Sequence, residues 1–264
     1  MMENININKF LKIPKFAKHV MLVASGKGGV GKSTFALNLA LTLRHLKFKV
    51  GLLDADIYGP SLPKLLNTKK EPKIENKKFL PIEVNGLKTM SIGYLIPEET
   101  ANIWRGPMVI KAITQLLKDV AWGELDILII DTPPGTGDVQ LTISQKIDVS
   151  GALIITTPQE LSLLDVKRGI NMFKKVNLPI LGLIENMSYY ICDECEKKHY
   201  IFGKKSSFKL ANNFDLEVLG ELPLCEDLVK NYDIQHPIIK QKKDDVIFKS
   251  FFDISQKILK KIKT

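Results

Sequence analysis

A glycine-rich segment with two lysines carries the strongest chemical pattern in the chain. Its residues read GKGGVGKST and satisfy G-x-x-x-x-G-K-[ST], in which glycines let successive backbone N–H groups point at phosphate oxygens. Lys32 is expected to neutralise the β- and γ-phosphates, and the Ser33 hydroxyl to bind Mg²⁺. An amphipathic helix follows, and its positive N-terminal end favours the same phosphates. The pattern predicts a nucleoside-triphosphate site formed by Gly26, Lys27, Gly28, Gly29, Val30, Gly31, Lys32, Ser33 and Thr34.

Carboxylates follow two further apolar runs. Asp54 and Asp56 end the run KVGLLDAD, and Asp131 ends the run LDILIID just before Thr-Pro-Pro-Gly. Ligands of open α/β sheets bind beyond the carboxyl ends of the strands. An acid placed there can hold Mg²⁺ directly or through water, and the N–H group of Gly135 can contact the γ-phosphate. One such aspartate is as often a helix cap. Three of them around one phosphate loop favour a catalytic site.

A Cys-x-x-Cys pair lies late in the chain. Cys192 and Cys195 offer two thiolates, whereas a structural zinc ion and a cubane iron–sulfur cluster each need four ligands. His199 could provide a third ligand, and the neighbouring sequence offers no evident fourth. Cys225 follows 30 residues later and is expected to be a small buried apolar residue. Residues 188–203 are therefore the predicted metal-binding segment.

The elements that must position these groups alternate between strand and helix. Short apolar runs separated by helix-period segments predict an α/β fold, with a mostly parallel sheet and helices on both faces. The predicted strands cover residues 19–25, 49–56, 125–131, 149–157, 179–187 and 216–222. The predicted helices cover residues 34–46, 107–121, 137–147, 160–175, 204–214 and 244–263.

The predicted domain organisation is simple. We expect an N-terminal tail over residues 1–18 and one P-loop ATPase domain over residues 19–264. The lysine-rich stretch 67–100 is interpreted as an insertion that carries two short strands, at about 79–84 and 87–92.

Composition narrows the class of protein. Hydrophobic residues make up 45% of the 264 residues and charged residues 25%, which excludes a disordered chain. No apolar run reaches the length of a membrane span, and three cysteines do not form a disulfide framework, so we expect a cytoplasmic protein. The net charge of +9 rests on lysine, since only Arg44, Arg105 and Arg168 are arginines. Specific nucleic-acid readout favours arginine, so no specific nucleic-acid partner is expected.

Several segments resemble known families of ATPases. Lys27 resembles the signature lysine of the deviant Walker A class, which includes MinD, ParA and the nitrogenase iron protein. In that class this lysine reaches the nucleotide of the partner in a face-to-face dimer. Further segments resemble the Mrp/ApbC family of iron–sulfur cluster carrier ATPases. They are LLDADIYGPS (52–61), WRGPM (104–108), IIDTPPGTGDVQLT (129–142), TTPQELSLLDVKRG (156–169), ILGLIENMSYYICDEC (180–195) and IFG (201–203).

The resemblance implies a role for each site residue. Asp56 positions the attacking water, Asp54 supports the metal shell, Asp131 and Gly135 form switch II, and Asn186 contacts the adenine. It further implies a homodimer with slow ATP hydrolysis that requires Mg²⁺. Two chains then supply four thiolates to one [4Fe–4S] cluster on the twofold axis, for delivery to apo iron–sulfur proteins.

Two alternatives remain open at this point. A positioning switch like MinD or ParA, whose ATP-dependent dimer binds membrane or DNA, would use the basic charge and a C-terminal amphipathic helix. We expect that helix to pack on the sheet instead, and a positioning ATPase has no use for Cys-x-x-Cys. An ATPase bridged by structural zinc differs only in its metal. The apolar face of the helix comprises Ile247, Phe251, Ile254, Ile258 and Ile262.

Overall fold

The computed structural model describes residues 13, 15–96, 106–135, 137–192, 194–225 and 246–262. Most of the predicted tail, Trp104 and Arg105 of the WRGPM segment, and Asp193 of the cysteine pair lie outside these residues.

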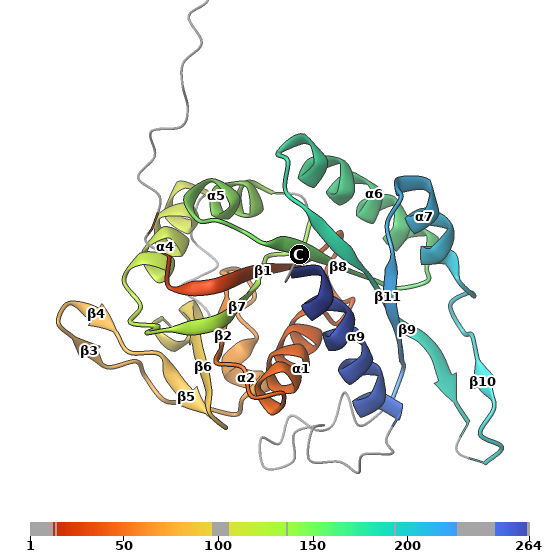
Figure 1. Cartoon of the computed structure of the whole chain (residues 1–264), viewed down its shortest axis with the longest axis horizontal. Helices are drawn as coiled ribbons and strands as arrows, with labels where there is room; N and C mark the ends of the chain where they lie inside the picture. The colour runs from red at the N-terminus through yellow and green to blue at the C-terminus, as the bar shows by residue number, and fades with distance from the viewer. Residues whose placement is uncertain are drawn as a thin grey trace, which may run out of the picture.

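A nine-stranded sheet forms the centre of the molecule (Figure 1). The strands follow the order β10-β9-β8-β1-β7-β2-β6-β5, and β11 also pairs with β9. Seven of them run parallel, while the edge strands β5 and β10 are antiparallel to their neighbours. The strands are β1 (Ala17–Ser25), β2 (Val50–Asp54), β5 (Ile82–Val84), β6 (Leu87–Ser91), β7 (Leu125–Asp131), β8 (Gly151–Thr156), β9 (Ile180–Ile191), β10 (Lys198–His199) and β11 (Val218–Pro223). A separate hairpin pairs β3 (Ile74–Glu75) with β4 (Lys78–Phe79).

Helices cover both faces of the sheet, as the sequence predicts. Figure 1 shows α1, α2 and α9 below the sheet and α4, α5, α6 and α7 above it. Each face has its own apolar core, because the buried parallel strands contribute side chains to both sides. The helices are α1 (Lys32–His45), α2 (Leu62–Leu65), η2 (Ile92–Tyr94, a 3₁₀ turn), α4 (Gly106–Lys118), α5 (Asp138–Lys146), α6 (Glu160–Lys175), α7 (Ser206–Phe214) and α9 (Val246–Ile262).

Several predicted boundaries differ from the structure by a few residues, and one predicted insertion belongs partly to the central sheet. β1 begins at Ala17, two residues inside the predicted tail. β9 continues past the predicted end at Met187 to Ile191, because its last residues pair with β10. The stretch 67–100 is not only an insertion, since β6 pairs in parallel with β2 and belongs to the central sheet.

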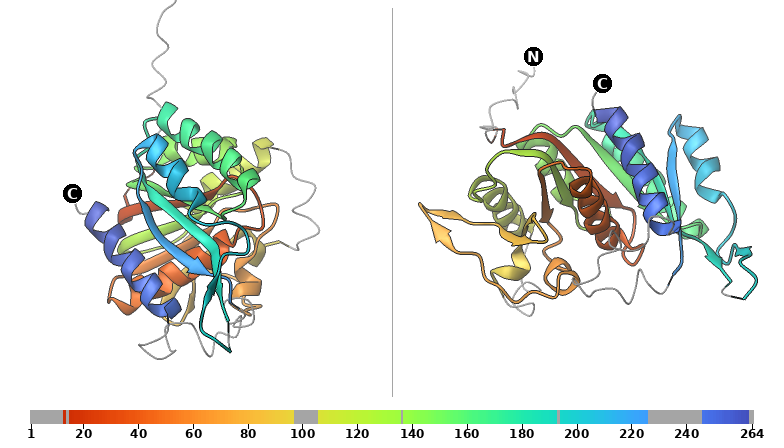
Figure 2. Two further views of the ribbon diagram at one scale, coloured as in Figure 1. Left: turned by 90° about the vertical axis from the view of Figure 1, so that its right-hand side faces the viewer. Right: turned by 60° about the horizontal axis from the view of Figure 1, so that its bottom comes forward.

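The C-terminal helix belongs to the core. The predicted apolar face of α9 is buried at all five positions, and α9 packs against α1 and β11. Figure 2 shows it lying along the sheet beside α1. Membrane attachment through this face therefore requires the helix to leave the core. Within the part of the chain that the structure describes, no helix is both long and apolar enough to cross a bilayer.

Candidate functional site

The phosphate loop connects the central strand β1 to the start of α1. Gly29 and Gly31 have φ values of 77° and 80°, a left-handed conformation that glycine adopts without strain. Gly26 packs so closely on α6 that an added Cβ would lie 2.5 Å from the Cβ atom of Asp165. The space beside Gly28 and Gly29 is open, since an added Cβ would meet no atom within 4 Å. The loop thus presents its backbone around an accessible hollow, which suits phosphate oxygens.

A cavity with a mostly apolar lining lies next to this loop. It has a volume of about 270 Å³ and is lined by Gly29, Gly31, Thr34, Phe35, Asn186, Met187, Leu222, Pro223, Leu224, Cys225 and Phe251. Asn186 is buried, and its Nδ2 atom donates to the Val30 carbonyl oxygen over 2.8 Å. An added Cβ on Gly31 would collide with the same Nδ2 atom. The structure thus brings Asn186 against the phosphate loop, and the half-buried Cys225 lines the same cavity.

Lys32 and two of the predicted carboxylates lie together beneath the loop. The parallel register places Asp54 of β2 directly beside Asp131 of β7. Lys32 Nζ lies 2.5 Å from Asp131 Oδ1, and both side chains are at most 7% exposed. A buried lysine–carboxylate pair of this kind is held by mutual attraction in a medium of low polarity. Lys32 therefore offsets the buried charge of Asp131, beside which Asp54 also lies.

Asp54 organises the loop that follows its own strand. Its Oδ2 atom accepts hydrogen bonds from the Ser61 and Leu62 backbone N–H groups and from the Ser91 hydroxyl, and its Oδ1 atom accepts from Asp56 N–H. Burial, and secondly the charge of Asp131, raise the pKa of the Asp54 carboxyl to about 7. Four donors on one carboxylate fix the position of Asp56 relative to the phosphate loop.

Asp56 lies at the rim of a second cavity, of about 460 Å³. This cavity separates the loop after β2 from the loop after β7, which includes Pro133 and Pro134. Asp56 Oδ1 accepts a hydrogen bond from Gly59 N–H at 3.3 Å, and the Tyr58 backbone also donates to this carboxylate. Burial is the main cause that raises the pKa of the Asp56 carboxyl. A partly free carboxylate with this placement can accept a proton or orient a water molecule.

Two glutamines to which the sequence pattern gave no role hold Lys27 and the loop after β7. Lys27 Nζ donates to Gln159 Oε1 at 3.0 Å, which orients the second loop lysine. Gln140 Nε2 donates to the carbonyl oxygens of Pro133 and Gly135, and its Oε1 atom accepts from Gly137 N–H. Both residues lie in segments that resemble the Mrp/ApbC family, 129–142 and 156–169, but the sequence pattern assigned neither a role.

Gly135 connects the loop after β7 to the phosphate loop. Its φ is 90°, and its N–H group donates to the Ser25 carbonyl oxygen at 2.8 Å. The predicted switch loop thus lies against the last residue of β1, where the phosphate loop begins.

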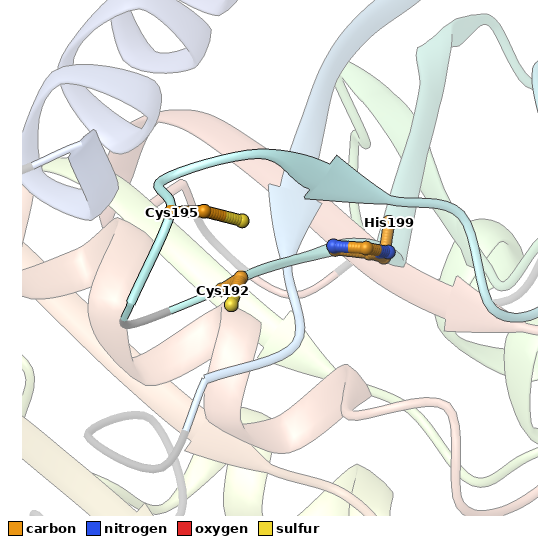
Figure 3. A group of neighbouring side chains, drawn as sticks. All are labelled: Cys192, Cys195 and His199. Atoms are coloured by element: carbon orange, nitrogen blue, oxygen red, sulfur yellow. The ribbon is translucent and has the colours of Figure 1, made fainter.

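The two cysteines lie at the tip of a β-hairpin. β9 and β10 pair in antiparallel register, with Lys198 opposite Ile191 and His199 opposite Tyr190. Cys192 N–H donates to the Lys197 carbonyl oxygen, and Glu196 N–H donates to the Cys192 carbonyl oxygen. Figure 3 shows the side chains of Cys192, Cys195 and His199 gathered at this tip. One ligand atom from each lies within 4.8 Å of the others.

Both sites lie at the same edge of the sheet. β9 runs parallel to β8, and β8 runs parallel to β1, so the carboxyl ends of β1 and β9 face the same way. The phosphate loop follows β1, and the cysteine hairpin extends from β9 (Figures 1 and 2). Fold and site together define a P-loop nucleotide-binding protein with two cysteines and a histidine, a group that could hold a metal ion, at the phosphate-loop edge of its sheet.

Comparison with known proteins identifies the family. Residues 16–259 match the family described as ParA, NUBPL iron-transfer P-loop NTPase, and the chain belongs to this family. It is 47% identical over 248 residues to an iron–sulfur cluster carrier protein of Aquifex aeolicus, covering 93% of this chain and 68% of the relative. It is 45% identical over 250 residues to the iron–sulfur cluster transfer protein NUBPL of Mus musculus, covering 94% and 78%.

Solved structures show the same fold. A nucleotide-binding protein from Archaeoglobus fulgidus, in complex with ADP and with cobalt found, is similar at a TM-score of 0.75 and 36% identity, covering 89% of this chain and 92% of that one. The cell division ATPase MinD of Pyrococcus furiosus matches at a TM-score of 0.69 and 20% identity, covering 92% and 99%. The second likeness concerns the fold alone.

Proposed function

We propose that this chain is an ATP-hydrolysing carrier that holds a [4Fe–4S] cluster as cargo between two copies of itself and transfers it to apo iron–sulfur proteins. The observation that carries this proposal is the position of Cys192 and Cys195 at an exposed hairpin tip, on the same edge of the sheet as the phosphate loop. Relatives that are 47% and 45% identical bear the names of cluster carrier and cluster transfer proteins.

The nucleotide part of the proposal assigns a task to each loop. The phosphate loop binds the triphosphate, Lys32 moves from Asp131 to the β- and γ-phosphates, and Ser33 with Asp54 and Asp131 supports Mg²⁺. Asp56 orients the attacking water, and Gly135 senses the γ-phosphate. The adenine enters the cavity beside Asn186. The open backbone at Gly28 and Gly29 supports this fit, as does the ADP named with the relative from Archaeoglobus fulgidus.

The cluster part of the proposal requires a dimer. One chain has two thiolates at the hairpin tip, whereas a cubane cluster held by cysteines needs four. A twofold axis at the tip supplies Cys192 and Cys195 from each chain. The Lys27 side chain is half-buried, and in the dimer it contacts the partner's nucleotide. A reducing compartment such as the cytoplasm keeps these cysteines as thiols.

Anaerobic reconstitution with iron and sulfide tests the cargo. We expect one [4Fe–4S] cluster per two chains, and transfer of that cluster to an apo-ferredoxin-type acceptor. Cys192→Ala and Cys195→Ala should each lose the cluster and keep ATP binding, because the phosphate loop follows a different strand. Cys225→Ala is the matched thiol control and should keep the cluster, since Cys225 lines the cavity beside Asn186 and does not lie at the hairpin tip. A cluster that persists in Cys192→Ala would refute the assignment.

A further inference from the structure

The hairpin tip carries a third metal ligand in the same chain. Residues directly opposite each other in an antiparallel pair share a face, and side chains alternate between faces along each strand. His199 therefore shares a face with Tyr190, and Cys192, which directly follows β9 and lies two residues after Tyr190, is on that face too. The backbone pairing of Cys192 with Lys197 makes Cys192 and His199 diagonal neighbours. Diagonal neighbours are within reach of each other's side chains.

Contacts on the opposite face confirm this alternation. Lys198 Nζ lies 4.0 Å from the ring centroid of Tyr189, and the rings of Tyr189 and Tyr200 are 6.1 Å apart. These three side chains occupy the face that excludes His199. The imidazole is thus on the side of the thiols because of strand register, which the hairpin's backbone hydrogen bonds fix.

The distances suit one tetrahedral ion. Two thiolates and an imidazole bound to zinc at about 2.0–2.3 Å stand roughly 3.5–3.8 Å apart. The three ligand atoms here already lie within 4.8 Å of one another without an ion. Cys195 and His199 are exposed and Cys192 is half-buried, so their side chains can close the remaining gap without repacking a core.

We propose that each single chain binds one divalent, thiolate-preferring cation of the zinc, cobalt(II) or iron(II) class through Cys192, Cys195 and His199. Three protein ligands leave the fourth position of a tetrahedral ion open to solvent. This ion uses both thiolates that the proposed cluster needs. On the basis of that proposed function, an ion held by one chain and a cluster held by two chains exclude each other.

Cobalt(II) titration of the full-length, reduced, metal-free protein tests the stoichiometry. We expect thiolate-to-cobalt and tetrahedral d–d absorption bands that saturate at one ion per chain. His199→Ala should weaken cobalt binding by roughly a hundredfold, because it removes one of three ligands. Lys198→Ala, on the opposite face, is the matched control and should bind as the unchanged protein does. Saturation at one ion per two chains, or an unchanged affinity in His199→Ala, would overturn the proposal.

Cluster reconstitution of the same variants separates this inference from the proposed function. His199→Ala should still assemble one cluster per two chains, since the cluster uses only thiolates. Cobalt-loaded protein should assemble the cluster more slowly than metal-free protein, and His199→Ala should lose most of that delay. Equal rates with and without cobalt would refute mutual exclusion. A chain that binds one cobalt ion but never a cluster would refute the carrier function and leave the single-ion site standing.

Discussion

Replacing Lys32 should damage the fold as well as nucleotide binding. Lys32 and Asp131 form a buried pair, with side chains 7% and 4% exposed, and Asp54 lies beside Asp131 in the parallel register. Lys32→Ala removes the cation and leaves two buried acids facing each other. Removal of one partner from a buried ion pair typically costs about 3–5 kcal/mol. Many domains have a total stability of only about 5–15 kcal/mol.

The acidity of Asp54 gives this effect a definite pH dependence. Burial, and then Asp131, raise the pKa of Asp54 from 3.8 to about 7, whereas Lys32 lowers it. The folded state therefore takes up a proton between about pH 4 and pH 7 that the unfolded state does not. Stability from this group falls as the pH rises through that window. Because Lys32→Ala removes an influence that lowers the pKa, the stability deficit of the variant should be larger at pH 8 than at pH 6.

Urea denaturation followed by circular dichroism measures the deficit. We expect Lys32→Ala to lose about 3–5 kcal/mol at pH 8. The double variant Lys32→Ala/Asp131→Asn should recover most of that loss, because no second buried charge remains, and should still fail to bind ATP. A deficit that does not change with pH, or a double variant no more stable than Lys32→Ala, would contradict this account of the buried pair.

Three further substitutions test the rest of the site and the core. Lys27→Ala should keep ATP binding in calorimetry and lose hydrolysis or its coupling to the dimer, since Lys27 contacts Gln159 rather than the phosphate loop's interior. Equal loss of ATP affinity in Lys27→Ala and Lys32→Ala would contradict this distinction. Asp56→Asn should bind Mg·ATP and hydrolyse it about a hundredfold or more slowly than the unchanged protein. The hydrolysis rate of the unchanged protein should fall at acidic pH, where the raised pKa of Asp56 keeps its carboxyl protonated, and the variant should lack this fall. Normal turnover would remove Asp56 from catalysis. Phe251→Ala should lower the free energy of unfolding by about 3–5 kcal/mol in thermal denaturation, because Phe251 is buried and its ring centroid lies 5.6 Å from that of Phe35. Phe252→Ala is the control and should lower it less, since Phe252 is half-buried.

The phosphate loop and its carboxylates could be predicted because their signals are local. A continuous apolar run such as LDILIID forms a buried strand in any α/β sheet, and the next polar residue then lies at the carboxyl edge. The contact between Asp54 and Asp131 requires more, namely that β2 and β7 are neighbours in register. Strand order is set by packing between distant segments, so the runs themselves do not encode it.

Strand β6 is an element whose place in the central sheet the sequence pattern did not predict. The sequence predicted LKTMS as a short strand within an insertion, yet it lies in the central sheet, and its Thr89 and Ser91 are fully buried. The Thr89 hydroxyl donates to the Ile82 carbonyl oxygen, and the Ser91 hydroxyl donates to Asp54. These hydrogen bonds offset the free-energy cost of burying the two hydroxyl groups, and neither partner is adjacent in sequence. Gln159 escaped prediction for the same reason, because its partner Lys27 lies 132 residues away, whereas the backbone partners of Gln140 lie within seven residues of it in the loop after β7.

Strand β9 places the two candidate sites at a fixed separation. Asn186 contacts the phosphate loop through the Val30 carbonyl oxygen, and Cys192 lies six residues further along the same chain. At about 3.3 Å per residue, six residues of extended strand span roughly 20 Å at most. Met187, between them, has a left-handed φ of 54° and lines the cavity next to the loop. We expect any influence of bound ATP on a metal at the hairpin tip to pass through this bent strand or through a partner chain, because Asn186 and Met187 of β9 line the cavity beside the phosphate loop.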